Sequence, residues 1–277
     1  MRDIFGYQGK RVVVTGAASG MGQATVRLLV ELGAEVYALD VKEVAEPVRK
    51  YVSTDLSRQE SIDAALAQIP GHVDRIFTCA GLPGPPFSDI AVNLVNFVGH
   101  RHLVESLLPR MSEGGAIAMI ASVGGMAWQM NFATVSQLLA TQDFEAARAW
   151  LEANPEAARG FGEVNSGLNA YGFSKQCLVA YVKTKAWGLG RRKIRINTLS
   201  PGTTETPMTP AFNQAYGKEV CDLLVGSIGR YATPEEMANP LVFLNSDMAS
   251  YISGHDLQVD YGFVAAILTG QKKFGAA

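Results

Sequence analysis

The sequence has few of the features expected of a secreted, nucleic-acid-binding or membrane-spanning protein. Its three cysteines are too few and too widely spaced for a disulfide framework or a zinc site, so we expect a reducing compartment. A net charge of −2 and the absence of any basic run longer than residues 191–193 argue against a nucleic-acid surface. The C-terminal apolar stretch 263–268 is too short to span a bilayer, and the N-terminus lacks a signal-peptide pattern. We therefore expect a cytoplasmic protein with neither a nucleic-acid nor a membrane partner.

The chain does have the apolar content of a compact enzyme, with 48% hydrophobic and 18% charged residues. Short β-branched runs alternate with segments of helical period, which indicates a parallel sheet covered by helices on both faces. We predict one doubly wound α/β domain of the Rossmann type over residues 1–277, with a seven-stranded, mainly parallel sheet. The expected strands are 11–15, 35–39, 51–54, 75–79, 116–121, 195–199 and 256–259. The expected helices are 21–32, 57–68, 90–111, 171–189 and 234–245.

One long segment interrupts this alternation. Residues 123–170 contain no strand pattern, and residues 133–154 within them are rich in alanine with apolar residues at helical spacing. We expect a helical insertion here, with residues 133–154 forming a helix.

A glycine-rich turn, Thr-Gly-Ala-Ala-Ser-Gly-Met-Gly, links the first strand to the first helix. Backbone amides at a helix start bind phosphate, and glycines let a pyrophosphate approach closely; an ordinary tight turn is the alternative. The next strand ends at Asp40, where a carboxylate would bond an adenosine ribose and repel a 2′-phosphate. These features favour NAD over NADP, although Lys42 lies close enough to leave NADP open.

Tyr171 and Lys175 are four residues apart at the start of a predicted helix, which places them on one face. An ammonium beside a phenol favours the ionised form and lowers its pKa, so Tyr171 could transfer a proton at neutral pH. The same spacing recurs at Tyr181 and Lys185. Ten residues turn a helix by about 280° and advance it about 15 Å, so the second pair cannot share the first pair's site. We read it as ordinary helix residues.

Taken together, these motifs resemble the classical short-chain dehydrogenase/reductase family over nearly the whole length, apart from the insertion. The resemblance implies hydride transfer between the nicotinamide and a carbinol or carbonyl carbon, with Tyr171 as acid/base and Lys175 also bonding the nicotinamide ribose. Ser122, at the end of the fifth strand, matches the family serine that donates to the substrate oxygen. Asn96, in Asn-Phe-Val-Gly, matches the asparagine that holds a relay water, with Asn93 as its rival.

The resemblance also implies contacts to the cofactor. Asp55 and Leu56 would meet the adenine, and Thr206 would bond the nicotinamide carboxamide. Cys79 stands where the family has an asparagine, for which we expect a small effect on stability, and Tyr261 departs from the family's Asp-Gly-Gly with a bearing on assembly. The full cofactor set is Gly16, Ser19, Gly20, Met21, Gly22, Asp40, Asp55, Leu56, Ala80, Gly81, Tyr171, Lys175, Pro201, Gly202 and Thr206.

Six apolar residues follow Ser122 and Thr206, and they favour an apolar, ring-bearing alcohol or ketone such as a steroid, terpenoid or aromatic substrate. Core filling or a dimer contact are the alternatives. These residues are Met126, Trp128, Met130, Met208, Phe212 and Tyr216. The insertion and the catalytic half resemble the bacterial 3α-hydroxysteroid dehydrogenase/carbonyl reductase subgroup. We expect this chain to form a homodimer or homotetramer. The competing hypothesis is a non-catalytic dinucleotide-binding sensor or scaffold.

His100 and His102 have the alternation of a metal pair on a strand. They fall in a predicted helix, however, where residues two apart face away from each other. We therefore expect no metal site and place both histidines at the surface or an interface.

Overall fold

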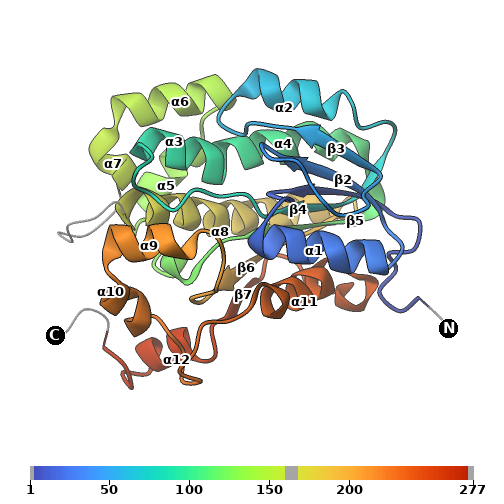
Figure 1. The fold of residues 1–277 in the computed structure, drawn as a ribbon. Coiled ribbons are helices and arrows are strands. Elements are labelled where there is room, and N and C mark those ends of the chain that lie inside the picture. The colour runs from blue at the N-terminus through green and yellow to red at the C-terminus, as the bar shows by residue number, and fades with distance from the viewer. Residues whose placement is uncertain (1–2, 160–167, 274–277) are drawn as a thin grey trace.

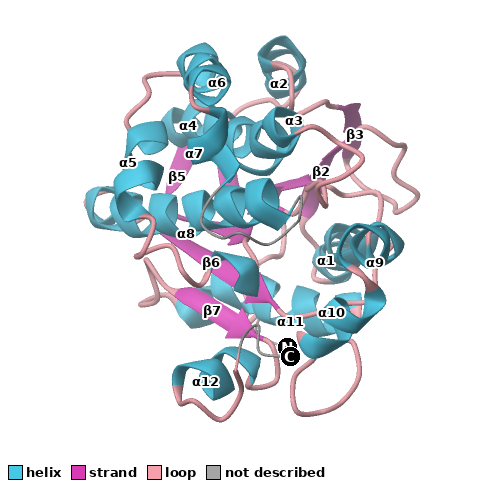
Figure 2. Ribbon diagram, turned by 90° about the vertical axis from the view of Figure 1, so that its left-hand side faces the viewer, coloured by secondary structure: helices cyan, strands magenta, loops and turns pink. Residues whose placement is uncertain are grey.

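The computed structural model describes residues 3–159 and 168–273 of the chain. A seven-stranded sheet in the order β3-β2-β1-β4-β5-β6-β7 runs through its centre, and all its strand pairs are parallel. Helices cover both faces (Figures 1 and 2), which confirms the predicted fold class. The strands are β1 (Arg11–Thr15), β2 (Glu35–Asp40), β3 (Lys50–Ser53), β4 (Val73–Thr78), β5 (Met111–Ile120), β6 (Arg195–Pro201) and β7 (Asp256–Val259).

The sheet is apolar on both sides because successive strand residues point into different cores. Val13 belongs to one core cluster, whereas Val12 and Val14 belong to the other. Helices α1 and α11 pack on the second face and contact each other, while α2, α4 and α8 pack on the first. The helices are α1 (Gly20–Glu31), α2 (Gln59–Leu66), α3 (Asp89–Asn93), α4 (Gly99–Leu107), α5 (Phe132–Leu139), α6 (Phe144–Ala153), α7 (Pro155–Arg159), α8 (Leu168–Gly190), α9 (Thr209–Tyr216), α10 (Lys218–Leu223), α11 (Pro234–Asn245) and α12 (Phe263–Leu268).

β1 and β4 are neighbours in the sheet. β2 and β3 lie beyond β1, and β5, β6 and β7 lie beyond β4, so the strand order reverses between β1 and β4. In an open parallel sheet, the strand ends at such a reversal form the crevice where ligands bind. The glycine-rich turn follows β1, and the loop carrying Ala80 and Gly81 follows β4. The fold therefore brings two of the predicted cofactor segments to the same edge.

The predicted helix 90–111 is wrong as a single element. The structure divides it into α3, a π-helical turn η1 (Leu94–Val98), α4 and a 3₁₀ turn η2 (Leu108–Arg110), and Met111 already starts β5. Pro109 has no N–H to donate to the turn before it, so the α-helix ends ahead of that residue.

The predicted helix 133–154 is also wrong as a continuous helix. It consists of α5 and α6, and Asp143 lies between them with its side chain accepting a hydrogen bond from the Ala146 N–H. A carboxylate that caps a new helix start competes with continuation of the preceding helix. Residues 160–167 of the insertion lie outside the described residues.

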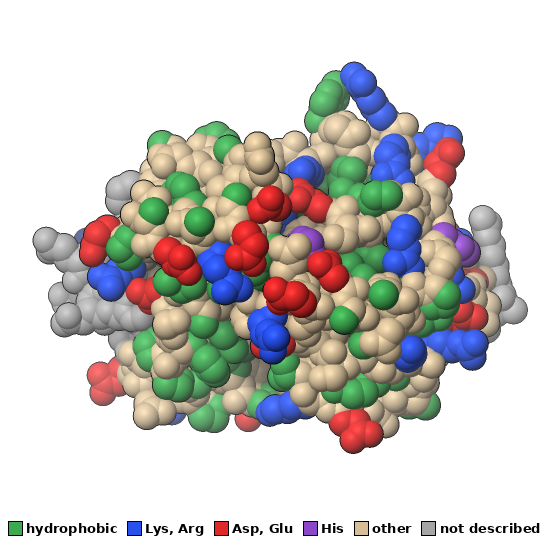
Figure 3. Space-filling view, turned by 90° about the horizontal axis from the view of Figure 1, so that it is seen from above, with side chains coloured by type: hydrophobic (Ala, Val, Ile, Leu, Met, Phe, Trp, Pro, Cys, Tyr) green, Lys and Arg blue, Asp and Glu red, His purple; other side chains and the backbone are tan. Residues whose placement is uncertain are grey.

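The insertion packs against α4, and its buried residues belong to the core cluster on the face of the sheet covered by α2, α4 and α8. Leu138, Phe144 and Leu151 are fully buried there, and the Arg101 guanidinium of α4 donates to the carbonyls of Leu138 and Asp143. The α2 and α6 side of the molecule carries intermingled acidic, basic and apolar side chains (Figure 3). That the chain folds as a single domain stays a prediction.

Two short 3₁₀ turns complete the fold, η3 (Val123–Gly125) after β5 and η4 (Asp247–Ala249) after α11. Among the described residues, no helix is long and apolar enough to cross a membrane.

Candidate active site

The glycine-rich turn owes its shape to close backbone approaches. Gly16 and Gly20 have φ angles of 67° and 55°, in the left-handed region that suits glycine. A Cβ on Gly22 would lie 2.0 Å from the carbonyl oxygen of Gly16, and one on Gly16 would lie 2.5 Å from the Ala80 nitrogen. The turn thus packs directly on the loop after β4, and α1 starts from it.

The N-terminus of α1 is suited to an anion. Ser19 is the N-cap but its side chain makes no capping hydrogen bond, and the first turn carries no acidic residue. Amides in the first turn of a helix have no partner within the helix and favour negative charge. The predicted residues Gly20, Met21 and Gly22 form this first turn, so the turn fits a dinucleotide diphosphate.

Asp40 ends β2 beside this turn. Its Oδ2 accepts a hydrogen bond from the Ala18 N–H at 3.0 Å, and its Oδ1 accepts one from the Lys42 N–H at 2.9 Å. The carboxylate is therefore held in one orientation at the edge of the glycine turn. Lys42 contributes its backbone amide to this arrangement.

The two predicted adenine contacts lie after β3. The Asp55 carboxylate accepts hydrogen bonds from both the N–H and the hydroxyl of Ser57. Leu56 is buried, and its carbonyl oxygen would lie 2.2 Å from a Cβ on Gly99. Leu56 therefore packs against the start of α4.

The loop after β6 reaches back to the glycine turn. Pro201 ends the strand, and the Gly202 N–H donates to the Val259 carbonyl. Thr206 lies over Gly20, since a Cβ there would meet Thr206 carbons at 3.4 Å. The loop after β6 therefore packs against the glycine turn.

Ser122 and Tyr171 meet at the carboxyl end of β5. Ser122 follows β5 directly, and its hydroxyl accepts a hydrogen bond from the Gly124 N–H at 3.1 Å. The Tyr171 side chain lies beside it, since a Cβ on Gly124 would meet the Ser122 hydroxyl oxygen at 3.5 Å and a Tyr171 ring carbon at 3.8 Å. Lys175, one turn further along α8, is only 3% exposed and its ammonium donates to the Ile120 carbonyl at 3.0 Å.

Asn96 lies in the π-helical turn and connects the loop after β4 to α8. Its Oδ1 accepts from the Leu82 N–H at 2.7 Å, and its Nδ2 donates to the Leu82 carbonyl and the Ser174 hydroxyl. A Cβ on Gly81 would lie 3.4 Å from Asn96 Oδ1 and 3.9 Å from Lys175 Nζ. Asn93, the rival, donates to the Asp89 carbonyl of its own helix.

The expected lowering of the Tyr171 pKa by Lys175 does not match this geometry. Burial raises the pKa of Tyr171, and the nearby Ser122 hydroxyl opposes this only in part. Lys175 Nζ lies 5.4 Å from the ring centroid and bonds a carbonyl instead. Burial also lowers the pKa of Lys175, to about 8. Desolvation, which disfavours both charged forms, outweighs their attraction here.

Two of the predicted substrate residues contact this site. The Phe212 ring of α9 lies edge-on to the Tyr171 ring, with centroids 5.1 Å apart and planes at 83°. The Met208 methyl would lie 3.9 Å from a Cβ on Gly81. Trp128 and Met126 pack against core clusters, Met130 is exposed, and the side chain of Tyr216 lies outside the described residues.

The structure overturns the expectation for one histidine. His102 lies near the surface and pairs with Asp63, but His100 is buried, with its ring nitrogens near Thr15 and Asn96. Helical spacing alone placed both histidines outside. His100 is enclosed because it meets the end of β1, 85 residues earlier in the chain.

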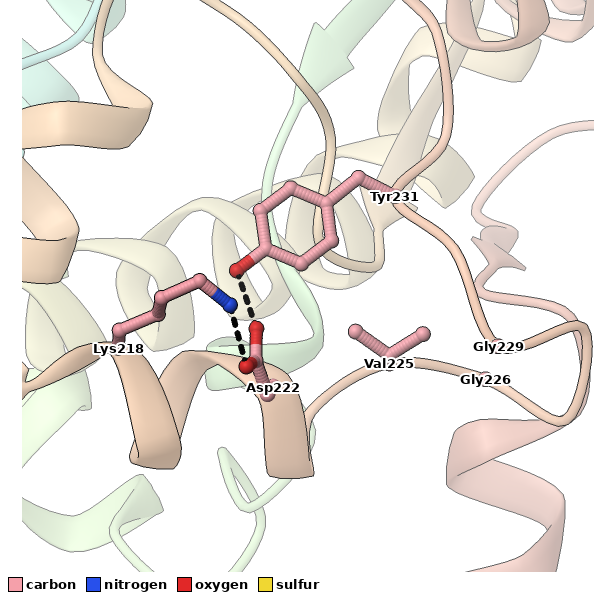
Figure 4. Close-up of a pocket in the computed structure, with 6 residues that line it drawn as sticks. All are labelled: Lys218, Asp222, Val225, Gly226, Gly229 and Tyr231. Carbon is pink, nitrogen blue, oxygen red and sulfur yellow. Dashed lines mark hydrogen bonds and ion pairs between the residues drawn. The ribbon is translucent and has the colours of Figure 1, made fainter.

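A separate pocket lies beside α10 (Figure 4). Lys218 and Tyr231 both bond the Asp222 carboxylate there, so these polar groups satisfy one another. The remaining lining residues are Val225, Gly226 and Gly229. None of the predicted proton-transfer residues borders this pocket.

Comparison with known families places two matches on the chain. The family model described as short chain dehydrogenase matches residues 10–136, and the one described as enoyl-(acyl carrier protein) reductase matches residues 158–264. The boundary between the two matches falls within the predicted insertion.

Similar proteins extend over almost the whole chain. Coniferyl-alcohol dehydrogenase of a Pseudomonas species is 31% identical, covering 92% of this chain and 97% of its own. The 3-alpha-hydroxysteroid dehydrogenase/carbonyl reductase of Comamonas testosteroni is 33% identical over the same shares. The crystal structure of a Pseudomonas 3-alpha-hydroxysteroid dehydrogenase complexed with NADH has a TM-score of 0.76 at 26% identity, covering 96% of this chain and 100% of that one.

Proposed function

Since this chain belongs to the short-chain dehydrogenase/reductase family and is an alcohol dehydrogenase or carbonyl reductase of that family, we propose that it transfers hydride between NAD(H) and an apolar, ring-bearing secondary alcohol or ketone. The observation that carries the proposal is the meeting of Ser122, Tyr171 and Lys175 at the edge that also holds the glycine turn. The sensor alternative is disfavoured, because the proton-transfer set is complete.

The preference for NAD rests on Asp40. Two backbone amides orient its carboxylate at the glycine turn, where the adenosine ribose of a dinucleotide would lie. A carboxylate can accept hydrogen bonds from both ribose hydroxyls but repels a 2′-phosphate. The relative crystallised with NADH supports the same choice.

The bound nicotinamide would supply hydride chemistry at its C4 atom. Gly20–Gly22 would hold the diphosphate, Thr206 the carboxamide and Lys175 the nicotinamide ribose. The tight packing of the turn supports this fit, since a side chain at Gly16 would clash with the Ala80 backbone and one at Gly22 with the Gly16 carbonyl.

Tyr171 would move the proton of the substrate oxygen. Because burial raises its pKa, the phenol is protonated at neutral pH and can donate to a carbonyl oxygen. Ser122 would donate a second hydrogen bond to the same oxygen, where charge develops during reduction. Asn96 lies beside Lys175 and would hold a relay water there.

The substrate class rests on Phe212 and Met208, which meet Tyr171 and the Gly81 loop. An aromatic ring edge-on to Tyr171 would stack or pack against a ring in the substrate. The names of the relatives, which include coniferyl alcohol and 3-alpha-hydroxysteroids, support the same class. In Phe212→Ala we expect kcat/KM to fall more for cyclic than for short acyclic alcohols.

The test is NADH formation with a panel of cyclic and aromatic secondary alcohols, and ketone reduction in reverse. Tyr171→Phe is expected to lower kcat by roughly 10²-fold or more. Tyr181→Phe is the matched control, since this tyrosine heads the second Tyr-x-x-x-Lys copy in the same helix and bonds Glu105. Equal rates for wild type and Tyr171→Phe would overturn the proposed function.

A further inference from the structure

His100 is a buried residue of α4 whose two ring nitrogens bond to different parts of the site. Its side chain is 1% exposed. Nε2 lies 3.0 Å from the Thr15 hydroxyl, at the end of β1. Nδ1 lies 3.2 Å from the backbone carbonyl of Asn96, four residues earlier in the π-helical turn η1. His100 therefore bridges the strand that leads into the glycine turn and the turn that carries Asn96.

The partners of Thr15 determine which ring nitrogen carries the proton. The Thr15 hydroxyl oxygen accepts from the Cys79 N–H at 3.1 Å and from the Ala80 N–H at 3.4 Å. With two donors on its lone pairs, this hydroxyl gives its own proton to His100 Nε2. Nε2 is then an acceptor, and the neutral ring carries its proton on Nδ1, which donates to the Asn96 carbonyl.

The chain of hydrogen bonds continues from Asn96 to the helix that carries Tyr171. Asn96 Nδ2 donates to the Ser174 hydroxyl at 3.2 Å. The Ser174 hydroxyl donates to the Tyr171 carbonyl at 2.7 Å. One continuous set of contacts thus joins the loop after β4, the end of β1, the π-helical turn and α8. Within this set, His100 is the member that links the end of β1 to the π-helical turn.

We propose that His100, as the Nδ1–H tautomer, is a positioning residue that fixes the Asn96 carbonyl relative to the Thr15 hydroxyl. It thereby keeps the cofactor turn and the proton-transfer residues at a constant spacing. The inference rests on the proposed function for its kinetic consequence, but the tautomer itself does not depend on turnover. Burial lowers the pKa of His100 to about 3, which is consistent with a neutral ring at neutral pH.

The tautomer is tested by nitrogen NMR of the full-length protein labelled with ¹⁵N-histidine. The chain has only four histidines, and a His100→Gln spectrum identifies the signals of position 100. We expect protonated Nδ1 and unprotonated Nε2 shifts that stay constant from pH 5 to 9. An Nε2–H pattern, or titration within that range, would overturn the proposal even if the enzyme turns over normally.

The positioning role is tested with two variants that each place an amide near one ring nitrogen. His100→Asn places an amide near Nδ1 and can still donate to the Asn96 carbonyl, whereas His100→Gln places its amide near Nε2 and loses that bond. We expect His100→Gln to lower kcat about tenfold, with KM for alcohol and NAD within about twofold, because small misplacements at a reacting site cost rate. His100→Asn should recover most of kcat.

His102→Gln, two residues along the same helix, is the control and should match the wild type in kcat and melting temperature. Equal kcat for His100→Asn and His100→Gln, or a wild-type kcat in His100→Gln, would rule out positioning through Asn96. If Tyr171→Phe is as active as the wild type, the proposed function fails, while the NMR result still decides the tautomer.

Discussion

The ammonium of Lys175 lies 5.4 Å from the centroid of the Tyr171 ring. The second copy of the motif has the same geometry, since Lys185 also lies 5.4 Å from the Tyr181 ring. Their surroundings differ: Lys185 is partly exposed and pairs with Glu105 at 2.7 Å, whereas Lys175 is buried and bonds only a neutral carbonyl among its recorded partners. The spacing of the motif therefore does not distinguish the two pairs, whereas the environment of the lysine does.

The burial of Lys175 predicts that the unfolding free energy of the protein depends on pH. The folded protein releases the Lys175 proton near pH 8, whereas a lysine in the unfolded chain holds it up to about pH 10.4. Between these values the unfolded state binds more protons, so the contribution of Lys175 to stability rises with pH. We expect the unfolding free energy of the wild type, minus that of Lys175→Met, to rise by about 2 kcal/mol from pH 8 to 10.

The measurement is urea unfolding at both pH values, where all other titrating groups cancel in the difference. Lys183→Met, on the exposed side of the same helix, controls for the loss of a lysine. A wild-type advantage that is constant or falls with pH would show that burial does not lower the Lys175 pKa.

Cofactor preference should depend on Asp40. Replacing it with alanine removes the acceptor for the Ala18 and Lys42 amides and the repulsion toward a 2′-phosphate. We expect the ratio of kcat/KM for NAD over NADP to fall at least about tenfold, which corresponds to 1.4 kcal/mol. Steady-state rates with both dinucleotides give this ratio, and Asp63→Ala, whose partner is His102, should leave it unchanged. An unaltered ratio in Asp40→Ala would remove Asp40 from cofactor selection.

Arg101 should determine whether the insertion stays attached to α4. Its guanidinium is 3% exposed and donates to the Leu138 carbonyl, the Thr141 hydroxyl and the Asp143 carbonyl at 3.1, 3.0 and 2.9 Å. In Arg101→Leu these acceptors lose a charged donor, so we expect a loss of about 3 kcal/mol in unfolding free energy.

Limited proteolysis should then cleave within residues 139–144 faster than in the wild type. Arg148→Leu is the control, because Arg148 donates a single recorded hydrogen bond, to the Ser57 carbonyl from α6. Arg148→Leu should lower the unfolding free energy by only about 1 kcal/mol. Equal losses for the two variants would mean that Arg101 has no special role in holding the insertion.

The order of strands and helices could be predicted because it depends on local patterns. Strands such as β1 and β2 are buried on both faces and therefore read as continuous apolar runs. The break at Asp143 and the π-helical turn around Asn96 were missed, because a capping side chain and an irregular helix leave no change in hydrophobic period.

The sequence indicates which residues belong to the candidate site better than it indicates what surrounds them. The burial of Lys175 and His100 depends on elements distant in sequence, such as the Thr15 contact to His100. Helical spacing states which way a side chain points on its own helix but not what covers that face. The roles of the predicted site residues stay predictions, and so does assembly as a homodimer or homotetramer.

Gly22 and Gly188 are both helical glycines, but only Gly22 lies too close to another part of the backbone to accept a side chain. A Cβ on Gly22 would lie 2.0 Å from the Gly16 carbonyl oxygen, whereas one on Gly188 meets no described atom within 4 Å outside its own helix. Gly22→Ala should distort the turn, lower the unfolding free energy by about 3 kcal/mol and weaken NADH binding. Gly188→Ala should raise stability by about 0.5–1 kcal/mol, because alanine favours a helix. NADH titration by fluorescence and urea unfolding measure both effects, and unweakened NADH binding by a folded Gly22→Ala protein would contradict the role of this turn as the diphosphate cradle.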